Sequence, residues 1–341
     1  MKQTLRKLVG ILLTVCLLVL TGVTGAFAKT PSPEVRAANV TAKAAGLDLG
    51  AYINKLTDLL DVSLTGDPAS DVGDLLVNTE VYNLLIVGVD SRLNDYEGRS
   101  DAMMVLSVNP LAGKVVLTSL LRDSWVSIPG NGEERLNEAY ALGGAQLLKK
   151  TIRQNYGIKI DGYVVVNFND VIDFIDDIGG IEMKLSAKEI QYVNKYTADQ
   201  NKELYGKKTN PDKITASAGT LKLNGMQALA YARVRYVGLD FGRTERQRKV
   251  IKTTLKTFFE QPVDTQVTLI AKYMQRVQTD VTIPELAFLV LVYLTLDRYE
   301  TTSFALPAEG TYSYTRINGK EVIKVDFDAN RALWRATVGL S

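Results

Sequence analysis

The sequence contains no histidine, and its single cysteine, Cys16, lies in an apolar run near the N-terminus. The absence of histidine excludes imidazole as a general base or a metal ligand. One cysteine cannot form an internal disulfide or a thiolate zinc site. Any catalysis by this chain must therefore depend on carboxylates, arginine, lysine, tyrosine or a metal ion that prefers oxygen ligands.

A large excess of one charge is also missing, because 40 Lys and Arg residues stand against 38 Asp and Glu residues, for a net charge of +2. Nucleic-acid-binding domains usually carry a clear basic excess, so we expect no nucleic-acid partner. The chain of 341 residues is 46% hydrophobic and 23% charged, which is typical of a globular protein.

The first 28 residues are typical of a transmembrane anchor or a signal segment. Lys2, Arg6 and Lys7 precede an uncharged run, residues 8–28, that is long enough to cross a bilayer as a helix. Basic residues before such a run keep the N-terminus in the cytoplasm. We therefore expect a single-pass protein of the cell membrane with its globular part outside the cytoplasm. Residues 26–28 also fit a signal-peptidase site, in which case the protein would be secreted.

The remaining chain divides into a tether and one main domain. Residues 29–77 are interpreted as a tether, because their first part is rich in Ala, Lys, Thr and Pro. The tether includes an amphipathic helix, predicted from the apolar stripe of residues 49–60. Residues 78–341 are expected to form the main, catalytic domain.

Arginines concentrate between residues 231 and 247. Arg233, Arg235 and Arg243 lie close together, with Asp240 as the one carboxylate between them. A single arginine usually pairs with a protein carboxylate, but three together exceed the carboxylates nearby. Because the guanidinium fork matches phosphate oxygens, the cluster favours a phosphorylated ligand.

A helix is predicted to begin near Gly242, because apolar residues after Gln247 recur at helical spacing. Extending this stripe towards the N-terminus places Arg243 and Gln247 on the inner face, where an arginine is costly unless an anion meets it. The other faces are expected to be solvated, and they carry Arg246, Lys249, Lys252 and Lys256.

Two carboxylates are predicted to meet at one edge of a sheet. The apolar run of residues 84–89 reads as a buried strand that ends at Asp90. Asp101 opens a strand that turns at residues 109–113 and returns before Arg122. Either carboxylate alone fits a helix cap or a surface position. Together, beside arginines, they favour a site for a hard cation such as Mg²⁺.

Strands and helices alternate in the rest of the chain. Residues 162–168 read as a buried strand, followed by a helix capped by Asn169. Residues 186–220 are polar and are interpreted as a long excursion, while residues 284–297 predict a helix buried on all sides. This mixture indicates an α/β or α+β sandwich.

Several short motifs follow one another along about residues 83–261. They are VGVDSR (87–92), GRSDAMM (98–104), SLLRDSWVSIPG (119–130), RLNEAYALGG (135–144), FIDDIGGI (174–181), LNGMQALAYARVR (223–235) and DFGRTERQ (240–247). In these motifs the chain resembles the LytR–CpsA–Psr (LCP) family of bacterial cell-wall ligases, because they occur in the order of the family and are specific as a set. Two departures are that Leu120-Leu121 stands where Ile-Pro is common, and Arg135 where Lys is common.

The resemblance implies an α-β-α sandwich whose central mixed sheet borders a hydrophobic pocket for a polyprenyl chain. It implies that Asp90 and Asp101 bind Mg²⁺ and that Asp101 and Arg122 act in catalysis. The residues that it assigns to the pyrophosphate are Arg99, Arg122, Arg233, Arg235, Arg243 and Gln247. The implied reaction transfers a glycopolymer from a polyprenyl-pyrophosphate carrier to a peptidoglycan hydroxyl, which forms a phosphodiester and releases polyprenyl phosphate.

Two other functions fit the same residues. One is hydrolysis of the polyprenyl-pyrophosphate substrate by water, which would need no glycan acceptor. The other is non-catalytic binding of an isoprenoid or an anionic glycan. A role in transcription is poorly supported, because only a few residues would lie on the cytoplasmic side and none of them form a basic recognition helix.

Overall fold

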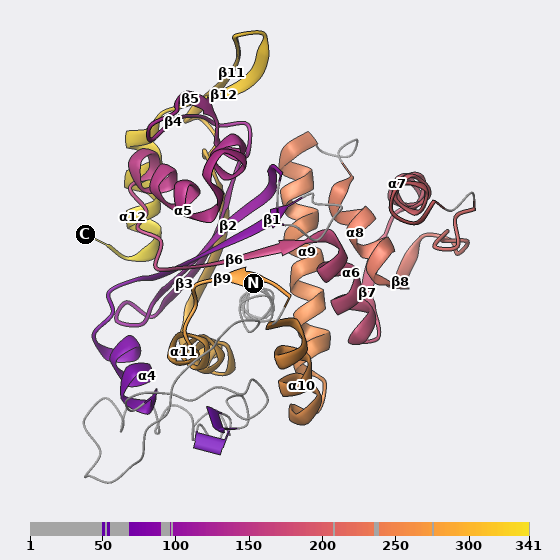
Figure 1. Ribbon diagram of the computed structural model, residues 1–341, viewed down its shortest axis with the longest axis horizontal. Helices are drawn as coiled ribbons and strands as arrows, with labels where there is room; N and C mark the ends of the chain where they lie inside the picture. The colour runs from indigo at the N-terminus through magenta and orange to yellow at the C-terminus, as the bar shows by residue number, and fades with distance from the viewer. Residues whose placement is uncertain are drawn as a thin grey trace.

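A six-stranded sheet lies at the centre of the molecule (Figure 1). The computed structural model describes residues 68–340, except 90–95, 97, 207–208, 235–238 and 275, together with residues 50–51 and 53–54. The strands follow the order β10-β3-β2-β1-β6-β9 across the sheet. Their bounds are β1 Tyr82–Val89, β2 Ser100–Asn109, β3 Lys114–Leu120, β6 Gly162–Asn167, β9 Gln278–Thr279 and β10 Glu300–Leu306.

The sheet is mixed, as the sequence predicts. β2 pairs antiparallel with both β1 and β3, whereas β1 with β6 and β3 with β10 form parallel pairs. In β1 every side chain except that of Gly88 is buried, because helices cover both faces of the sheet and an apolar run satisfies both sides.

One face of the sheet packs against α5 (Leu136–Tyr156) and α12 (Phe327–Val338). Alternate strand residues such as Leu85 and Val105 join Ile152 and Trp334 in this core. The helices lie together on one side of the sheet in Figure 1. We call this layer the α5 layer.

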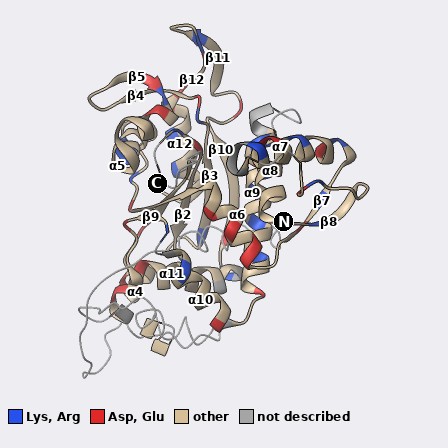
Figure 2. Cartoon of the chain, turned by 45° about the vertical axis from the view of Figure 1, so that its right-hand side comes forward, with Lys and Arg blue, Asp and Glu red and all other residues tan. Residues whose placement is uncertain are grey.

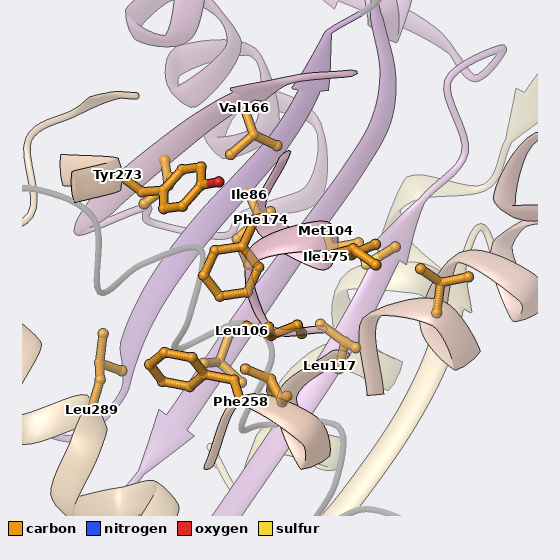
Figure 3. Packing of buried hydrophobic residues seen from close by; sticks show 14 of the residues in the cluster. Ile86, Met104, Leu106, Leu117, Val166, Phe174, Ile175, Phe258, Tyr273 and Leu289 are labelled. Atoms are coloured by element: carbon orange, nitrogen blue, oxygen red, sulfur yellow. The ribbon is translucent and has the colours of Figure 1, made fainter. Parts of the chain in front are cut away.

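The other face packs against α9 (Leu239–Phe259) and α11 (Ile283–Leu294), and we call this layer the α9 layer. Figure 3 shows Met104 and Leu106 of the sheet in the same cluster as Phe174 and Phe258. The two phenylalanine rings have centroids 5.6 Å apart. Helices on both faces make the fold an α-β-α sandwich. The bounds of the other helices near this layer are α4 Pro68–Val77, α6 Phe168–Asp177, α8 Gly225–Arg233 and α10 Val263–Met274.

The prediction that α11 is buried on all sides is confirmed. Every side chain from Leu286 to Val292 is at most 2% exposed. Such a helix cannot be amphipathic, because the sheet, α4 and the other helices leave it no solvent face. Among the described residues, no helix is both long enough and apolar enough to span a membrane. Residues 8–28 lie outside that part of the chain.

Three two-stranded antiparallel sheets complete the fold. The first and third lie next to each other at the end of the molecule shown at the top of Figure 1. Asn318 and Gly319, both at positive φ, form the turn of the third, as the sequence predicts. The strand pairs are β4–β5 (Trp125–Ile128 and Gly132–Arg135), β7–β8 (Ile181–Leu185 and Gly219–Leu223) and β11–β12 (Tyr312–Ile317 and Lys320–Val325).

Several local predictions are wrong. The polar excursion contains a 19-residue helix, α7 (Ala187–Tyr205), which a capping box between Ser186 and Glu189 starts. The cap of α6 is Asn167, because its side chain accepts from the backbone N–H of Asp170. α9 begins at Leu239, three residues before the expected start. The buried face of α7 mixes apolar residues such as Val193 with polar ones such as Thr197 and Asn201, so apolar periodicity alone did not reveal the helix.

Candidate functional site

The candidate site lies at one edge of the central sheet, where several strands begin or end. Val89, the last residue of β1, pairs with Ser100 at the start of β2 and with Asn167 at the end of β6. The carboxyl ends of parallel strands are where open α/β sheets bind their ligands. Asp90, which follows β1 directly, lies outside the described residues.

Asp101 and Arg122 meet at this edge, as predicted. The hairpin register pairs Met104 with Ser119, and its extension places residue 101 opposite residue 122, one position from the expected partner. The Nη1 atom of Arg122 contacts Oδ1 of Asp101. Both side chains keep some solvent contact, with exposed fractions of 17% for Arg122 and 25% for Asp101.

A second carboxylate, Asp123, also faces Arg122. The Nε atom of Arg122 lies 3.5 Å from Asp123, and that of Arg135 lies 3.6 Å from the other oxygen of Asp123. A row of alternating charges, Asp101, Arg122, Asp123 and Arg135, therefore lies beside the sheet edge. It aligns the guanidinium of Arg122 from two sides and leaves it partly accessible.

The backbone that carries Arg122 is fixed by segments distant in sequence. The N–H of Leu121 donates to Leu306 at the end of β10 (2.9 Å), and the N–H of Ile323 in β12 donates to the carbonyl of Asp123 (2.9 Å). The N–H of Asn137 in α5 donates to the carbonyl of Arg122 itself (3.2 Å). These bonds hold the arginine in place before any ligand arrives, which is the preorganisation that charge stabilisation needs.

Arg99 lies on the segment before β2 and pairs with Glu138 of α5. Its guanidinium is 2.7 Å from the Glu138 carboxylate and its side chain is 62% exposed. An exposed pair of this kind is weak, so an anionic ligand can compete for Arg99.

Tyr96, which lies between β1 and β2, forms hydrogen bonds with two residues that are distant in sequence. Its backbone has a positive φ of 54°, its hydroxyl donates to the buried carboxylate of Asp170 (3.0 Å), and its carbonyl accepts from the Tyr140 hydroxyl (2.9 Å). Burial raises the pKa of Asp170, although the Tyr96 hydroxyl and Arg276 favour its charged form. The sequence did not predict the hydrogen bond from Tyr96 to Asp170, because nothing local in the sequence links a tyrosine to a helix residue 74 positions away.

Arg233 lies at the last position of α8, and its guanidinium lies over the ring of Phe168, 4.8 Å from the centroid. Phe168 directly follows Asn167, so Arg233 belongs to the same sheet edge. The close approach of α8 to α6 depends on Gly225, because a Cβ there would lie 2.1 Å from the carbonyl oxygen of Ile172. The neighbouring Arg235 lies outside the described residues.

Arg243 is buried in α9, with 5% of its surface exposed, as its predicted inward direction requires. Gln247, one turn later, is partly buried. The prediction that Arg246 is solvated is wrong, because Arg246 is also 5% exposed. It faces α7 and α8, where it donates to the carbonyl of Val234. α9 contacts the sheet on one side and other helices on a second side. It therefore buries two rows of side chains, of which the sequence revealed one.

Arg248 was not among the predicted site residues. Its Nη1 atom donates to the hydroxyl of Ser119, a 1% exposed residue of β3, over 3.0 Å. Burial lowers the pKa of Arg248 despite the favourable charge of Glu245. The signal was present in the sequence, because Arg248 lies seven residues before the buried Leu255 and so shares its face of α9.

The residues at this edge can bind a phosphate ester. Guanidinium groups reach this edge from three parts of the chain, namely the segments that carry Arg99, Arg122 and Arg233. Arg243 is buried in α9, which packs against α8. Lys and Arg are otherwise spread over many elements (Figure 2). For a metal ion, Asp101 is a suitable oxygen donor, since only its Oδ1 atom contacts Arg122. No group of three acidic residues that could hold a metal occurs among the described residues.

Comparison with known proteins gives a family match. The model of the LytR_cpsA_psr family matches residues 55–337. Biofilm regulatory protein A of Streptococcus mutans is 31% identical over 275 residues, which cover 74% of this chain and 63% of that protein. The chain thus spans less than two thirds of this relative.

Two further proteins are similar. The polyisoprenyl-teichoic acid–peptidoglycan teichoic acid transferase TagU of Enterococcus faecalis is 30% identical over 270 residues, which cover 76% of this chain and 82% of TagU. Among solved structures, the LytR-CPS2A-psr family protein YwtF (TagT) with bound octaprenyl pyrophosphate lipid has a TM-score of 0.56 at 20% identity. That match covers 81% of this chain and 94% of the other, and it shows the shared fold.

Proposed function

This chain belongs to the LytR–CpsA–Psr family, and on that basis we propose that it transfers a glycopolymer from a polyprenyl-pyrophosphate carrier to peptidoglycan. The observation that carries the proposal is the contact between Arg122 and Asp101 at a sheet edge that also holds Arg99 and Arg233. The names of TagU, a transferase, and of TagT with its bound lipid support the same chemistry.

In the proposed reaction a hydroxyl oxygen of the acceptor attacks the phosphorus that carries the glycan. The bond from this phosphorus to the bridging oxygen breaks, and polyprenyl phosphate leaves with the bridging oxygen. The hydroxyl proton would pass to a carboxylate, for which Asp101 and Asp90 are the candidates. Phosphoryl transfer mainly requires positioning and charge stabilisation, so a site without histidine is sufficient.

The proposed roles of the arginines follow from their positions. Arg122 is fixed by neighbouring carboxylates and by its backbone, so it can stabilise the charge that develops on the transferred phosphate. The other predicted pyrophosphate ligands, Arg99, Arg233, Arg235, Arg243 and Gln247, would orient the non-bridging oxygens. Asp101, with Asp90, would hold Mg²⁺, which would neutralise charge on the pyrophosphate when bound.

The polyprenyl chain is proposed to enter the α9 layer, which begins at the site edge. This layer contains the apolar helix α11 and the aromatic cluster of Phe174, Phe258 and Tyr273. An isoprenoid hydrocarbon needs walls of this kind, because each buried CH₂ group contributes about 0.8 kcal/mol.

Purified protein with a lipid-linked pyrophosphate glycan, assayed with and without peptidoglycan, tests the proposal. We expect polyprenyl phosphate to be released only with the acceptor present, together with a new glycan phosphodiester. Arg122→Lys should lower the transfer rate roughly 100-fold or more, because a lysine keeps the charge but loses the fork. Arg316→Lys, on the exposed face of β11, is the matched control and should retain full activity.

The same assay separates the two other functions. Release of polyprenyl phosphate at the same rate without acceptor would identify a hydrolase. Binding without turnover, with or without Mg²⁺, would identify a non-catalytic binding protein. Either result would contradict the proposed transfer.

We also propose that the protein is anchored in the cell membrane with its catalytic domain outside the cytoplasm. The motivation is the basic start of the chain and the uncharged residues 8–28. A lipid carrier and a peptidoglycan acceptor are both found at that surface. Fractionation of cells tests this placement.

A further inference from the structure

Arg248 is a cationic group without a carboxylate partner in the part of the chain that the structure describes. Its one hydrogen bond goes to the neutral hydroxyl of Ser119. Glu245, the nearest carboxylate in sequence, instead pairs with Lys249 at 2.8 Å. The charge of Glu245 favours the charged form of Arg248, but no described carboxylate pairs with it directly. A partly buried guanidinium without a paired carboxylate is costly, and an anionic ligand would offset that cost.

The remaining donors of Arg248 keep some solvent contact. Its Nε and Nη2 atoms have no acceptor among the described residues, and neither is one of the fully buried polar atoms that lack a partner. In Arg246, by contrast, Nε is sealed inside the protein. The guanidinium of Arg248 is thus held through Nη1, while Nε and Nη2 remain as two neighbouring donors, the number that bidentate binding of an anion needs.

Arg248 also marks a boundary between polar and apolar surroundings. It lies on α9 five residues after Arg243, about 7.5 Å further along the helix axis. On the apolar side, Leu117 and Leu255 belong to the core of the α9 layer. Ser119 continues the strand row of Leu117 towards Arg122, because alternate residues of a strand share a face.

From this boundary position we propose that Arg248 binds the lipid-side phosphate of the polyprenyl carrier, the phosphate that departs with the hydrocarbon chain. The assignment rests on the proposed function and adds a ligand for the leaving group. When the bond from the glycan-side phosphorus to the bridging oxygen breaks, the bridging oxygen gains negative charge on the lipid phosphate. Arg248 neutralises that charge, while Ser119 fixes its guanidinium.

Binding of three probes to the detergent-solubilised full chain tests the assignment. The probes share one short prenyl chain and end in a monophosphate, a pyrophosphate or an uncharged hydroxyl. We expect Arg248→Gln to weaken the monophosphate and the pyrophosphate roughly ten- to hundred-fold, because both carry the lipid-side phosphate. Binding of the uncharged prenol should not change. Arg248→Lys should weaken the charged probes less than Arg248→Gln does.

Lys249→Gln, on the exposed side of the same turn, is the matched control and should leave all three affinities unchanged. Unchanged monophosphate binding in Arg248→Gln would overturn the assignment, as would an equal loss of the uncharged prenol, since that would show a purely structural role. If Arg248→Gln does not fold, Arg248→Lys decides, and wild-type affinity for the monophosphate would then refute the assignment.

The binding test of Arg248 and the transfer assay can fail independently of each other. A wild-type protein that binds the charged probes through Arg248 but never transfers glycan would refute the transferase and leave the phosphate ligand in place. A wild-type protein that binds none of the charged probes would refute both.

Discussion

Arginines on one helix serve different purposes, and their immediate neighbours decide which. Arg246 donates to the carbonyl of Val234 and lies near Glu189, whose carboxylate accepts a hydrogen bond from Tyr231. Burial opposes ionisation of Glu189, but bonds from Ser186 and Tyr231 outweigh this effect and lower its pKa. Arg246 therefore belongs to a network that joins α7, α8 and α9, and we assign it to stability rather than to ligand binding.

Replacement of Arg246 by glutamine should lower the free energy of unfolding by about 2–3 kcal/mol, because it removes a charged donor from a buried network. Urea denaturation measures this loss. Lys249→Gln, three residues on and exposed, should change stability by no more than about 0.5 kcal/mol. Equal stabilities of the two variants would show that the buried network contributes nothing.

At the scale of elements, α6 connects the site to the rest of the α9 layer. Its first residue, Phe168, lies under Arg233, and its last, Asp177, contacts α10. The Asp177 carboxylate accepts from Lys272 and from the Tyr273 hydroxyl, both at 2.6 Å. Burial opposes ionisation of Asp177, but these two bonds outweigh it and lower its pKa.

The lowered pKa of Asp177 predicts a pH dependence of stability. Because the folded state binds a proton less readily than the unfolded chain, the stabilisation is fully present above the unfolded pKa, about 3.9. It is lost as the pH falls through the lower folded pKa. The stability difference between wild type and Asp177→Asn should therefore be constant above about pH 5 and shrink below pH 4. Urea titrations across this range would contradict the assignment if the difference grew instead.

At the scale of the whole molecule, the sheet separates two layers with different tasks. The α5 layer holds the backbone of Arg122 through Asn137, and the α9 layer carries Arg233, Arg243 and Arg248. The candidate site lies at the sheet edge where Arg122 and Arg233, one from each side, are found. The core of the α9 layer already includes Ile53, which follows the segment, residues 8–28, that is proposed to cross the membrane.

Removal of residues 1–28 should release the protein from membranes without unfolding it. Wild type should sediment with the membrane fraction of cells, and the truncated chain should be soluble with the same thermal unfolding midpoint, because no core residue of the described fold lies in that segment. Wild type in the soluble fraction at its full mass would contradict the anchor. Wild type found outside the cells and shortened by this segment would instead show a cleaved signal.

The sequence by itself determined the features that depend on local pattern. The apolar runs of β1 and α11, the Asn318-Gly319 turn and the register that brings Asp101 to Arg122 were all readable, because strand and helix periodicity reports which faces are buried. The absence of histidine restricted the chemistry before any fold was known. The arginine-rich segment predicts an anion site, but the sequence does not show which arginines take part in it.

Only the tertiary structure decided which arginines are buried and by what. Arg246 and Arg248 differ by two positions, yet one is enclosed by α7 and α8 and the other reaches Ser119 on the sheet. The hydrogen bond from Tyr96 to Asp170 likewise joins segments that are remote in sequence. The physical reason is that the cost of burying a charge depends on every group around it, and those groups come from parts of the chain that only folding brings together.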